Sequence, residues 1–375
     1  MALDFLVGLN PYGASFITGT GSNHPIHNVF GQFFPGMPQI PGGISHLYSG
    51  EYDLPSAGIL LRALTKFRNN TSGEKMNKQT SSTLISGTGK KLTVLSPLLK
   101  NKYRLSLLGD YHFTLDDERG LPYTSYSARM AQWTNTDVKK LENWFEDACK
   151  EGSRAILLLG DMLSFPSEKG VDVLASLIKN SPIPVHFIAG NHDWHYEGVP
   201  GSDMAQRKEW IPKRLLPLYN GNDPMNYAVE IDGLKILMVD NSTYELTASQ
   251  LAFLRKELAD KKPAILGCHI PFYLFLPSHS SVNFGCGNPS WGAATDPYWE
   301  IERRERWKEE GLSKETFAFH KEIFSAENML GTVAGHTHKY SLDVFQNKFQ
   351  LVVPSKECYT LELGPAFFPT LPEVE

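Results

Sequence analysis

The 375-residue sequence contains no apolar run near the roughly 18 residues that a membrane-spanning helix needs. Its four cysteines share no CxxC spacing and are too few for a disulfide framework. The N-terminus has no basic region followed by an apolar stretch and a cleavage site, so we expect no signal peptide. The formal net charge of −5 does not fit a nucleic-acid-binding surface, which is usually basic. These absences predict a cytoplasmic protein with neither a membrane nor a nucleic acid as partner; they leave its oligomeric state open.

One polar stretch divides the chain. Residues 68–91 contain no aromatic residue and are rich in Asn, Ser, Thr, Gly and Lys. Such a composition buries little apolar surface and indicates a linker. It separates a segment of residues 1–67 from a larger region of residues 92–375.

The larger region alternates strand and helix patterns. A helix is indicated from Val138, with Thr136 as its N-cap, and another follows the capping box of Thr247 and Gln250. The dipeptide Asp232-Gly233 favours a type I′ hairpin turn, and Gln346-Asn347 joins a second pair of strand patterns. The alternation, with its hairpins, predicts an α/β fold with mixed sheets. The apolar runs that predict strands are Leu105–Leu108, Ala155–Leu159, Val185–Ala189, Lys235–Val239, Ala264–Leu266 and Met329–Ala334.

Polar side chains follow five of these runs, mostly behind a glycine. Loops at the carboxyl edge of a sheet are where open α/β folds build their sites, so we expect these side chains to converge. Any one of them is typical of a turn or a helix cap, and the prediction depends on the ordered set. In the last segment, alternate positions on an extended strand would point two histidines to one side. The residues are Asp110 and His112, then Asp161, then Asn191, His192 and Asp193, then His269, then His336 and His338.

The ordered set D-x-H, G-D, G-N-H-D, a lone His and G-H-T-H resembles the calcineurin-like metallophosphoesterase superfamily over about residues 102–365. The resemblance implies a two-sheet α/β sandwich with mixed sheets, helices outside and a binuclear metal centre at its edge. It implies that Asp161 bridges the two metals and that His192 lies over the substrate phosphate. The sequence departs from the family at Ser164, where Asp or Asn is frequent. The implied ligands are Asp110, His112 and His338 for one metal, and Asn191, His269 and His336 for the other.

The mixed oxygen and nitrogen donors suit Mn, Fe or Zn as divalent or trivalent ions and suit calcium poorly. Two such ions lower the pKa of a shared water and neutralise charge on a phosphoryl group. We therefore expect hydrolysis of a phosphate mono- or diester, small or macromolecular, by a metal-bridging hydroxide. His192 fits a general acid, because imidazole titrates near neutral pH. Asp193 either orients His192 or caps a turn.

Three further residues lie near these motifs in the sequence. His195 is close enough in the sequence to contact a metal-binding residue without binding the metal itself. Arg303, in the insertion between His269 and His336, either grips phosphate or pairs with neighbouring glutamates on a solvated helix, and the interleaved glutamates favour the second alternative. Cys268 is expected in the core, because adjacent strand residues face opposite sides.

Residues 1–67 resemble the C-terminal end of family 9 glycoside hydrolases, and Glu51 falls where that family places its general acid. The family's sugar-binding His-His-Arg motif is reduced to His27-Asn28, and a glycosidase needs two carboxylates. We interpret the segment as a small helical or irregular remnant. Two alternative functions stay open: a cellulase-like glycoside hydrolase or other carbohydrate-related role, and a phosphoesterase-like scaffold without catalysis.

Overall fold

The computed structural model describes residues 28–29, 32–33, 83–124, 135–196, 199, 203–274, 285–287 and 312–366. The chain divides into two compact units, residues 1–80 with 275–278 and residues 81–274 with 279–375. In the first unit, the described residues form the antiparallel strands β1 (Asn28–Val29) and β2 (Gln32–Phe33). The resemblance of residues 1–67 to a glycoside hydrolase, Glu51 included, otherwise lies outside the described residues and stays a prediction. Among the helices described, none has the length and apolar character to cross a bilayer.

The second unit contains two six-stranded mixed sheets. The first sheet has the order β3-β4-β14-β5-β6-β7, in which β5, β6 and β7 run parallel. All four residues of β6 are buried, which is why this strand is a continuous apolar run in the sequence. The strands are β3 (Leu84–Thr88), β4 (Lys91–Ser96), β5 (Tyr103–Leu108), β6 (Ala155–Leu158), β7 (Val185–Phe187) and β14 (Cys358–Pro365).

The second sheet has the order β12-β13-β11-β10-β9-β8, in which β9, β10, β11 and β13 run parallel. Asp232 and Gly233 both have positive φ, 48° and 91°, as the type I′ turn between β8 and β9 requires. Gln346 and Asn347 do the same between β12 and β13, with φ of 49° and 61°. The strands are β8 (Asn226–Ile231), β9 (Leu234–Val239), β10 (Ala264–Gly267), β11 (Met329–Ala334), β12 (Ser341–Phe345) and β13 (Lys348–Val352).

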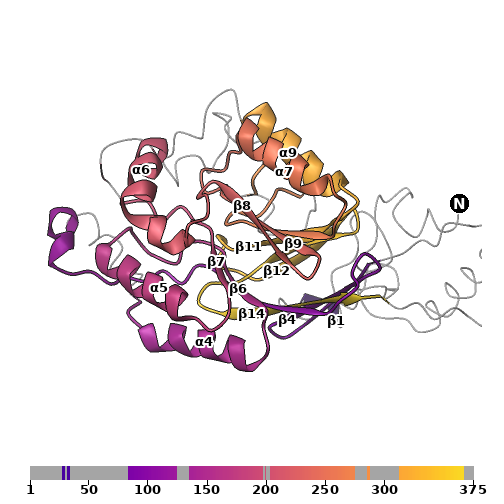
Figure 1. Ribbon diagram of the computed structural model, residues 1–375, viewed down its shortest axis with the longest axis horizontal. Coiled ribbons are helices and arrows are strands. Elements are labelled where there is room, and N and C mark those ends of the chain that lie inside the picture. Colours follow the sequence, from indigo (N-terminus) through magenta and orange to yellow (C-terminus); the bar gives the residue numbers. More distant parts are fainter. Residues whose placement is uncertain are drawn as a thin grey trace, which may run out of the picture. The chain divides into compact units, whose positions relative to one another are not determined.

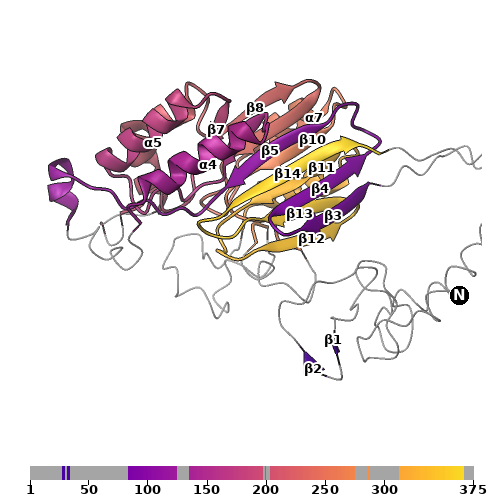
Figure 2. The ribbon, with the colours of Figure 1, turned by 90° about the horizontal axis from the view of Figure 1, so that it is seen from below.

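Helices cover the outer faces of the two sheets. Helices α4 (Val138–Lys150) and α5 (Glu168–Asn180) lie on one side, and α7 (Ala248–Leu258) and α9 (Lys314–Ser325) lie on the opposite side (Figure 1). The turned view shows the two sheets as stacked layers (Figure 2). The predicted α/β two-sheet sandwich is therefore confirmed. Among the described residues, the remaining helices are η1 (Glu118–Tyr123), α6 (Asp203–Trp210), η3 (Ile211–Leu215) and η4 (Leu216–Tyr219).

The two predicted helix caps have different outcomes. The capping box of Thr247 and Gln250 is present at the start of α7, with both reciprocal hydrogen bonds. The N-cap of α4 is Asp137, not Thr136, because the Asp137 carboxylate accepts the backbone N–H of Lys140 at 2.9 Å.

The linker predicted at residues 68–91 extends too far toward the C-terminus. Strand β3 lies inside it and pairs with β4 across a tight turn in which Gly89 has a φ of 57°. β3 is an edge strand with four of its five residues exposed, and its Ser, Gly and Thr continue the polar composition of the preceding stretch, which hides the strand pattern. The sheet therefore begins at Leu84, before the boundary placed at residue 92.

Candidate metal centre

The carboxyl ends of β5 and β6 in one sheet, and of β10 and β11 in the other, meet at one edge of the sandwich. The loop after β5 runs beside the loop after β6, because the backbone N–H groups of Asp110 and His112 donate to the carbonyls of Gly160 and Asp161 at 3.0 and 2.9 Å. In the other sheet, the N–H of Gly335 donates to the carbonyl of His269 at 2.9 Å. These bonds align the segments that follow the strands.

One group of ligand atoms comes from both sheets. Asp110 and His112 follow β5, and His338 follows β11. The Nε2 atoms of the two histidines lie 2.9 Å apart, and Nε2 of His338 lies 3.4 Å from Oδ1 of Asp110. Asp110 and His112 are buried, and the side chain of His338 is 32% exposed. The structure thus brings together the three residues that the family resemblance assigns to one metal.

A second group contains Asp161 after β6, His269 after β10 and His336 after β11. Nε2 of His269 lies 3.2 Å from Oδ2 of Asp161 and 3.2 Å from Nδ1 of His336. Nδ1 of His269 donates to the carbonyl of Leu159 at 2.8 Å. That bond keeps a proton on Nδ1, so Nε2 of His269, once it loses its own proton, directs a lone pair at the group, which is the usual orientation of a metal-binding histidine.

Asp161 also belongs to a third group, with His112 and His192. Oδ1 of Asp161 accepts the backbone N–H of His192 at 2.7 Å, and the rings of His112 and His192 are 5.0 Å apart at 80°. The side chain of His192 is only partly buried. Asp161 therefore lies between the first and second groups, and His192 lies at their accessible rim.

The donor atoms fit metal ions. Two pairs of imidazole nitrogens, His112 with His338 and His269 with His336, point at each other beside a carboxylate. The amide Oδ1 of Asn191 is buried and has no hydrogen-bond partner among the described residues. Buried polar atoms normally have partners, and a cation supplies one for convergent lone pairs. Two carboxylates, one amide and four imidazoles form a donor set suited to Mn, Fe or Zn.

Asp161 sets the charge balance of this cluster. Burial by itself would raise the pKa of Asp161, but the imidazoles of His269, His192 and His112 hold it well below its usual range. Burial by itself would lower the pKa of His269, and Asp161 overcomes this and raises it to about 9. Burial, together with the neighbouring histidines, lowers the pKa of His112 to about 3 despite the opposing effect of Asp161. One imidazole of the cluster thus binds a proton tightly while another stays neutral.

Five of the candidate ligands have left-handed backbone conformations, which are uncommon for residues other than glycine. The prediction that His336 and His338 lie on an extended strand is wrong, because β11 ends at Ala334 and both residues follow it in a loop. Backbone strain of this kind costs on the order of 1–3 kcal/mol per residue and concentrates at functional sites. The φ values are 52° for Asp110, 52° for His112, 50° for Asp161, 72° for His336 and 60° for His338.

Two glycines permit the close approach of these loops. A Cβ atom on Gly190 would lie 2.2 Å from Oδ1 of Asp161, and one on Gly335 would lie 2.3 Å from Oδ2 of Asp110. Any larger residue at either position would displace a carboxylate of the cluster.

Asp193 connects the loop after β6 with the loop after β7. Its Oδ2 accepts the backbone N–H groups of Asp161 and Gly190 at 2.8 and 2.7 Å, and its Oδ1 accepts that of Leu163 at 2.7 Å. Burial and the carboxylate of Asp161 raise the pKa of Asp193, and the N–H donors oppose the rise. These contacts match the turn-capping alternative for Asp193 and hold the backbone on either side of Asn191.

Comparison with protein families identifies the chain. The family described as calcineurin-like phosphoesterase matches residues 103–340, which include every candidate ligand. The chain belongs to this family. A search of curated proteins finds no significant match.

Solved phosphoesterase structures resemble the chain at low identity. A dimetal phosphatase from Danio rerio is 12% identical, with a TM-score of 0.43, and the match covers 68% of this chain and 88% of that one. A purple acid phosphatase from yellow lupin (Lupinus luteus) seeds is 13% identical, with a TM-score of 0.39 over 75% of this chain and 49% of that one. The phosphopantetheinyl hydrolase of Mycobacterium tuberculosis is 11% identical, with a TM-score of 0.33 over 68% and 90%. Similarity at this level does not bear on the activity of this calcineurin-like phosphoesterase.

The remaining predicted residues have separate outcomes. Ser164, where this phosphoesterase departs from the family pattern, donates its hydroxyl to the carbonyl of His112 at 3.0 Å. Cys268 is buried, and its thiol lies 3.3 Å from the carbonyl of Ile270. His195 is half-buried beside Trp194. Arg303 lies outside the described residues, so neither of its alternative roles is settled.

The loop after β9 contributes residues that the sequence analysis missed. Asn241 accepts the N–H groups of His269 and Ile270 at 3.2 and 3.0 Å and donates to the carbonyl of Ile270 at 2.6 Å. Ser242 accepts the indole N–H of Trp194 at 2.9 Å and donates to Asp240 at 2.6 Å. The signal was present in the sequence, because Asp240 and Asn241 follow a predicted strand just as the five recognised motifs do.

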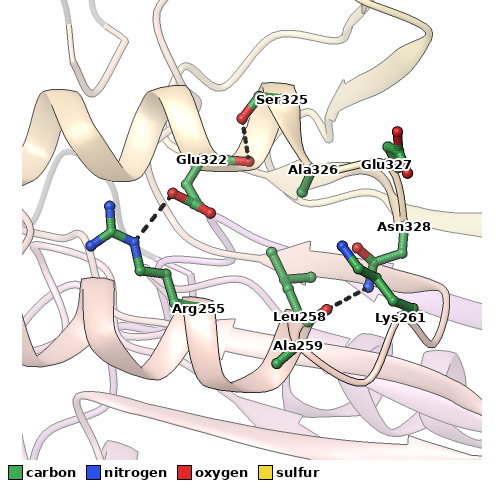
Figure 3. Close-up of a pocket in the computed structure, with 9 residues that line it drawn as sticks. All are labelled: Arg255, Leu258, Ala259, Lys261, Glu322, Ser325, Ala326, Glu327 and Asn328. Carbon is green, nitrogen blue, oxygen red and sulfur yellow. Dashed lines mark hydrogen bonds and ion pairs between the residues drawn. The ribbon is translucent and has the colours of Figure 1, made fainter.

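A polar hollow of about 420 Å³ lies elsewhere, between the C-terminal ends of α7 and α9 (Figure 3). Arg255 and Glu322 form an ion pair across it at 3.2 Å. Its lining residues precede β10 and β11 in the chain, whereas the candidate ligands follow these strands. The hollow is therefore at the opposite ends of the strands and is not part of the metal centre.

Proposed function

We propose that this protein is a binuclear metal-dependent phosphoesterase that hydrolyses phosphate mono- or diesters. The observation that supports this most is the position of Asp161, which belongs to ligand groups with histidines from both sheets. A carboxylate with two oxygens in that position is suited to bridge two cations. Asp110, His112 and His338 would hold one of them, and Asn191, His269 and His336 the other.

When bound, the metal pair supplies a hydroxide from water of lowered pKa and neutralises charge on the phosphoryl oxygens. The protein positions that pair through strained loops fixed by Asp193 and Asn241, so the ligands need little rearrangement. The partly exposed ring of His192 lies where a substrate can reach it and would donate a proton to the leaving oxygen.

Activity assays test the reaction class. We expect Mn²⁺-dependent hydrolysis of p-nitrophenyl phosphate or of its bis ester, abolished by a chelator and restored by added metal. Soluble cellulose serves as the competing substrate. Cellulose cleavage that survives the chelator, without phosphoesterase activity, would contradict the proposal; tight metal binding with no hydrolysis of any phosphate ester would indicate the scaffold alternative.

A histidine variant tests the proton donor. The variant His192→Ala should keep both metals and lose roughly 10²–10⁴-fold in turnover on alkyl phosphate esters, the usual contribution of a positioned acid. The loss should shrink on p-nitrophenyl esters, because their leaving group needs little protonation. His186→Ala, on β7 within the first sheet, is the matched control and should leave both rates unchanged. Equal losses on the two classes of ester would assign His192 to phosphate binding instead.

A further inference from the structure

Tyr244 is a fully buried tyrosine whose hydroxyl contacts a candidate ligand. It lies in the loop after β9, the neighbour of β10 in the second sheet. Its Oη is 2.5 Å from Nε2 of His336, and the two rings meet edge to face at 5.3 Å and 82°. Its φ is 64°, a left-handed conformation that is unusual for a bulky residue and indicates a constrained position.

The two nitrogens of His336 face different partners. Nδ1 lies 3.2 Å from Nε2 of His269 and points into the group that contains Asp161, while Nε2 points at Tyr244. A neutral imidazole carries one proton. If Nδ1 provides a lone pair to a metal, the proton must be on Nε2, and the oxygen of Tyr244 is the atom that accepts it.

We propose that Tyr244 is the positioning residue for His336, which it holds in the tautomer that binds metal through Nδ1. This inference rests on the proposed metal centre. A metal-binding histidine normally donates its second N–H to a carboxylate, a carbonyl or water. His269 follows that rule by donating to the carbonyl of Leu159, and His336 would donate its second N–H to the phenol oxygen of Tyr244.

The loop after β9 is built to hold the phenol in place. The backbone N–H of Tyr244 donates to the carbonyl of Asn241 at 2.8 Å, and its own carbonyl accepts the thiol of Cys286 at 3.1 Å. Asn241 in turn accepts the backbone N–H of His269. One loop therefore orients both histidines of the same ligand group, His269 through its backbone and His336 through its ring.

The test is metal binding by Tyr244→Phe in the full-length chain, measured by calorimetric titration of metal-free protein with Mn²⁺ and no substrate. We expect one of two binding events to weaken by about 10–100-fold, the usual effect of removing such a partner, and the other to stay unchanged. Tyr227→Phe is the matched control, because it removes another buried hydroxyl, bonded to the carbonyl of Phe187 at 2.8 Å. The control should lower the unfolding midpoint without changing Mn²⁺ affinity.

Two results would overturn the proposal in different ways. Equal Mn²⁺ affinities in Tyr244→Phe and wild type would reject the positioning role and leave the phosphoesterase proposal standing, whereas a wild-type chain without tight Mn²⁺ binding would reject both. If Tyr244→Phe does not fold, histidine ¹⁵N spectra of zinc-loaded wild type decide the question. A proton on Nε2 of His336 supports the proposal, and a proton on Nδ1 overturns it.

Discussion

Replacement of Ser242 by alanine should destabilise the protein and loosen the loop that carries His192. Ser242 is fully buried, and its hydroxyl links the indole N–H of Trp194 to the carboxylate of Asp240. Trp194 follows Asn191, His192 and Asp193 directly in the chain and is also fully buried. The variant therefore removes the hydrogen bond of a buried indole N–H in the loop that presents the proposed acid.

The expected loss in the free energy of unfolding follows from the two hydrogen bonds of the Ser242 hydroxyl. An unsatisfied buried N–H costs about 1–3 kcal/mol, and the lost hydroxyl bond to a carboxylate adds to it. Asp240 keeps two other contacts, the backbone N–H of Ser242 at 2.8 Å and the guanidinium of Arg207, which limits the second cost. We therefore expect a loss of about 2–4 kcal/mol in the free energy of unfolding. Turnover on alkyl esters should fall by up to about 10²-fold through misplacement of His192.

The assay is urea unfolding of the metal-free protein, paired with hydrolysis of alkyl and p-nitrophenyl esters. Ser153→Ala is the matched control, since it removes a buried hydroxyl bonded at 2.8 Å to Ser106, in the first sheet. It should cost about 1 kcal/mol and leave turnover unchanged. An unfolding free energy for Ser242→Ala within about 0.5 kcal/mol of wild type would refute the reasoning.

Three other predictions follow from the same structure. Asp161→Asn should lose tight Mn²⁺ binding at both positions by elemental analysis, because the shared negative charge is gone; two tightly bound ions in this variant would exclude a bridging role. His269, with its pKa raised to about 9 against an ordinary value near 6.5, stabilises the metal-free fold below pH 6.5, and this contribution is lost as the pH rises through 9. Since metal binding must displace that proton, Mn²⁺ affinity measured by calorimetry should rise about tenfold per pH unit up to pH 9; a flat profile would contradict the assignment. A chain that starts at residue 81 should keep the second unit folded and active, whereas one that starts at Lys90 loses β3 and should be less stable in urea; equal unfolding midpoints would show that β3 is dispensable.

The sequence predicted the layers of the fold because the strands that matter most are buried on both faces. Strand β6, with all four residues buried, is a continuous apolar run that can be recognised from the sequence alone. Strand β3 was not recognised from the sequence, because an edge strand with exposed residues resembles a linker. The N-cap of α4 was displaced by one residue, because both Thr136 and Asp137 are suitable caps and only the geometry shows which one meets an N–H group.

The predicted ligands came together because each follows a parallel strand, and parallel strands end at one edge. The contacts between side chains and backbone atoms could not be predicted from the sequence. Asp193 accepts from three N–H groups and Asn241 from two; both residues follow predicted strands, but no residue pattern shows which backbone groups they meet. The contact between Tyr244 and His336 joins residues 92 positions apart, so only the order of β9, β10 and β11 in the second sheet brings them together.

Anomalous diffraction from crystals of the Mn²⁺-loaded protein tests the central claim most directly, because it locates the metals without reference to activity. The account predicts two manganese peaks, one bounded by Asp110, His112 and His338 and the other by Asn191, His269 and His336, with the carboxylate of Asp161 between them. A single peak, or peaks away from these residues, would contradict it.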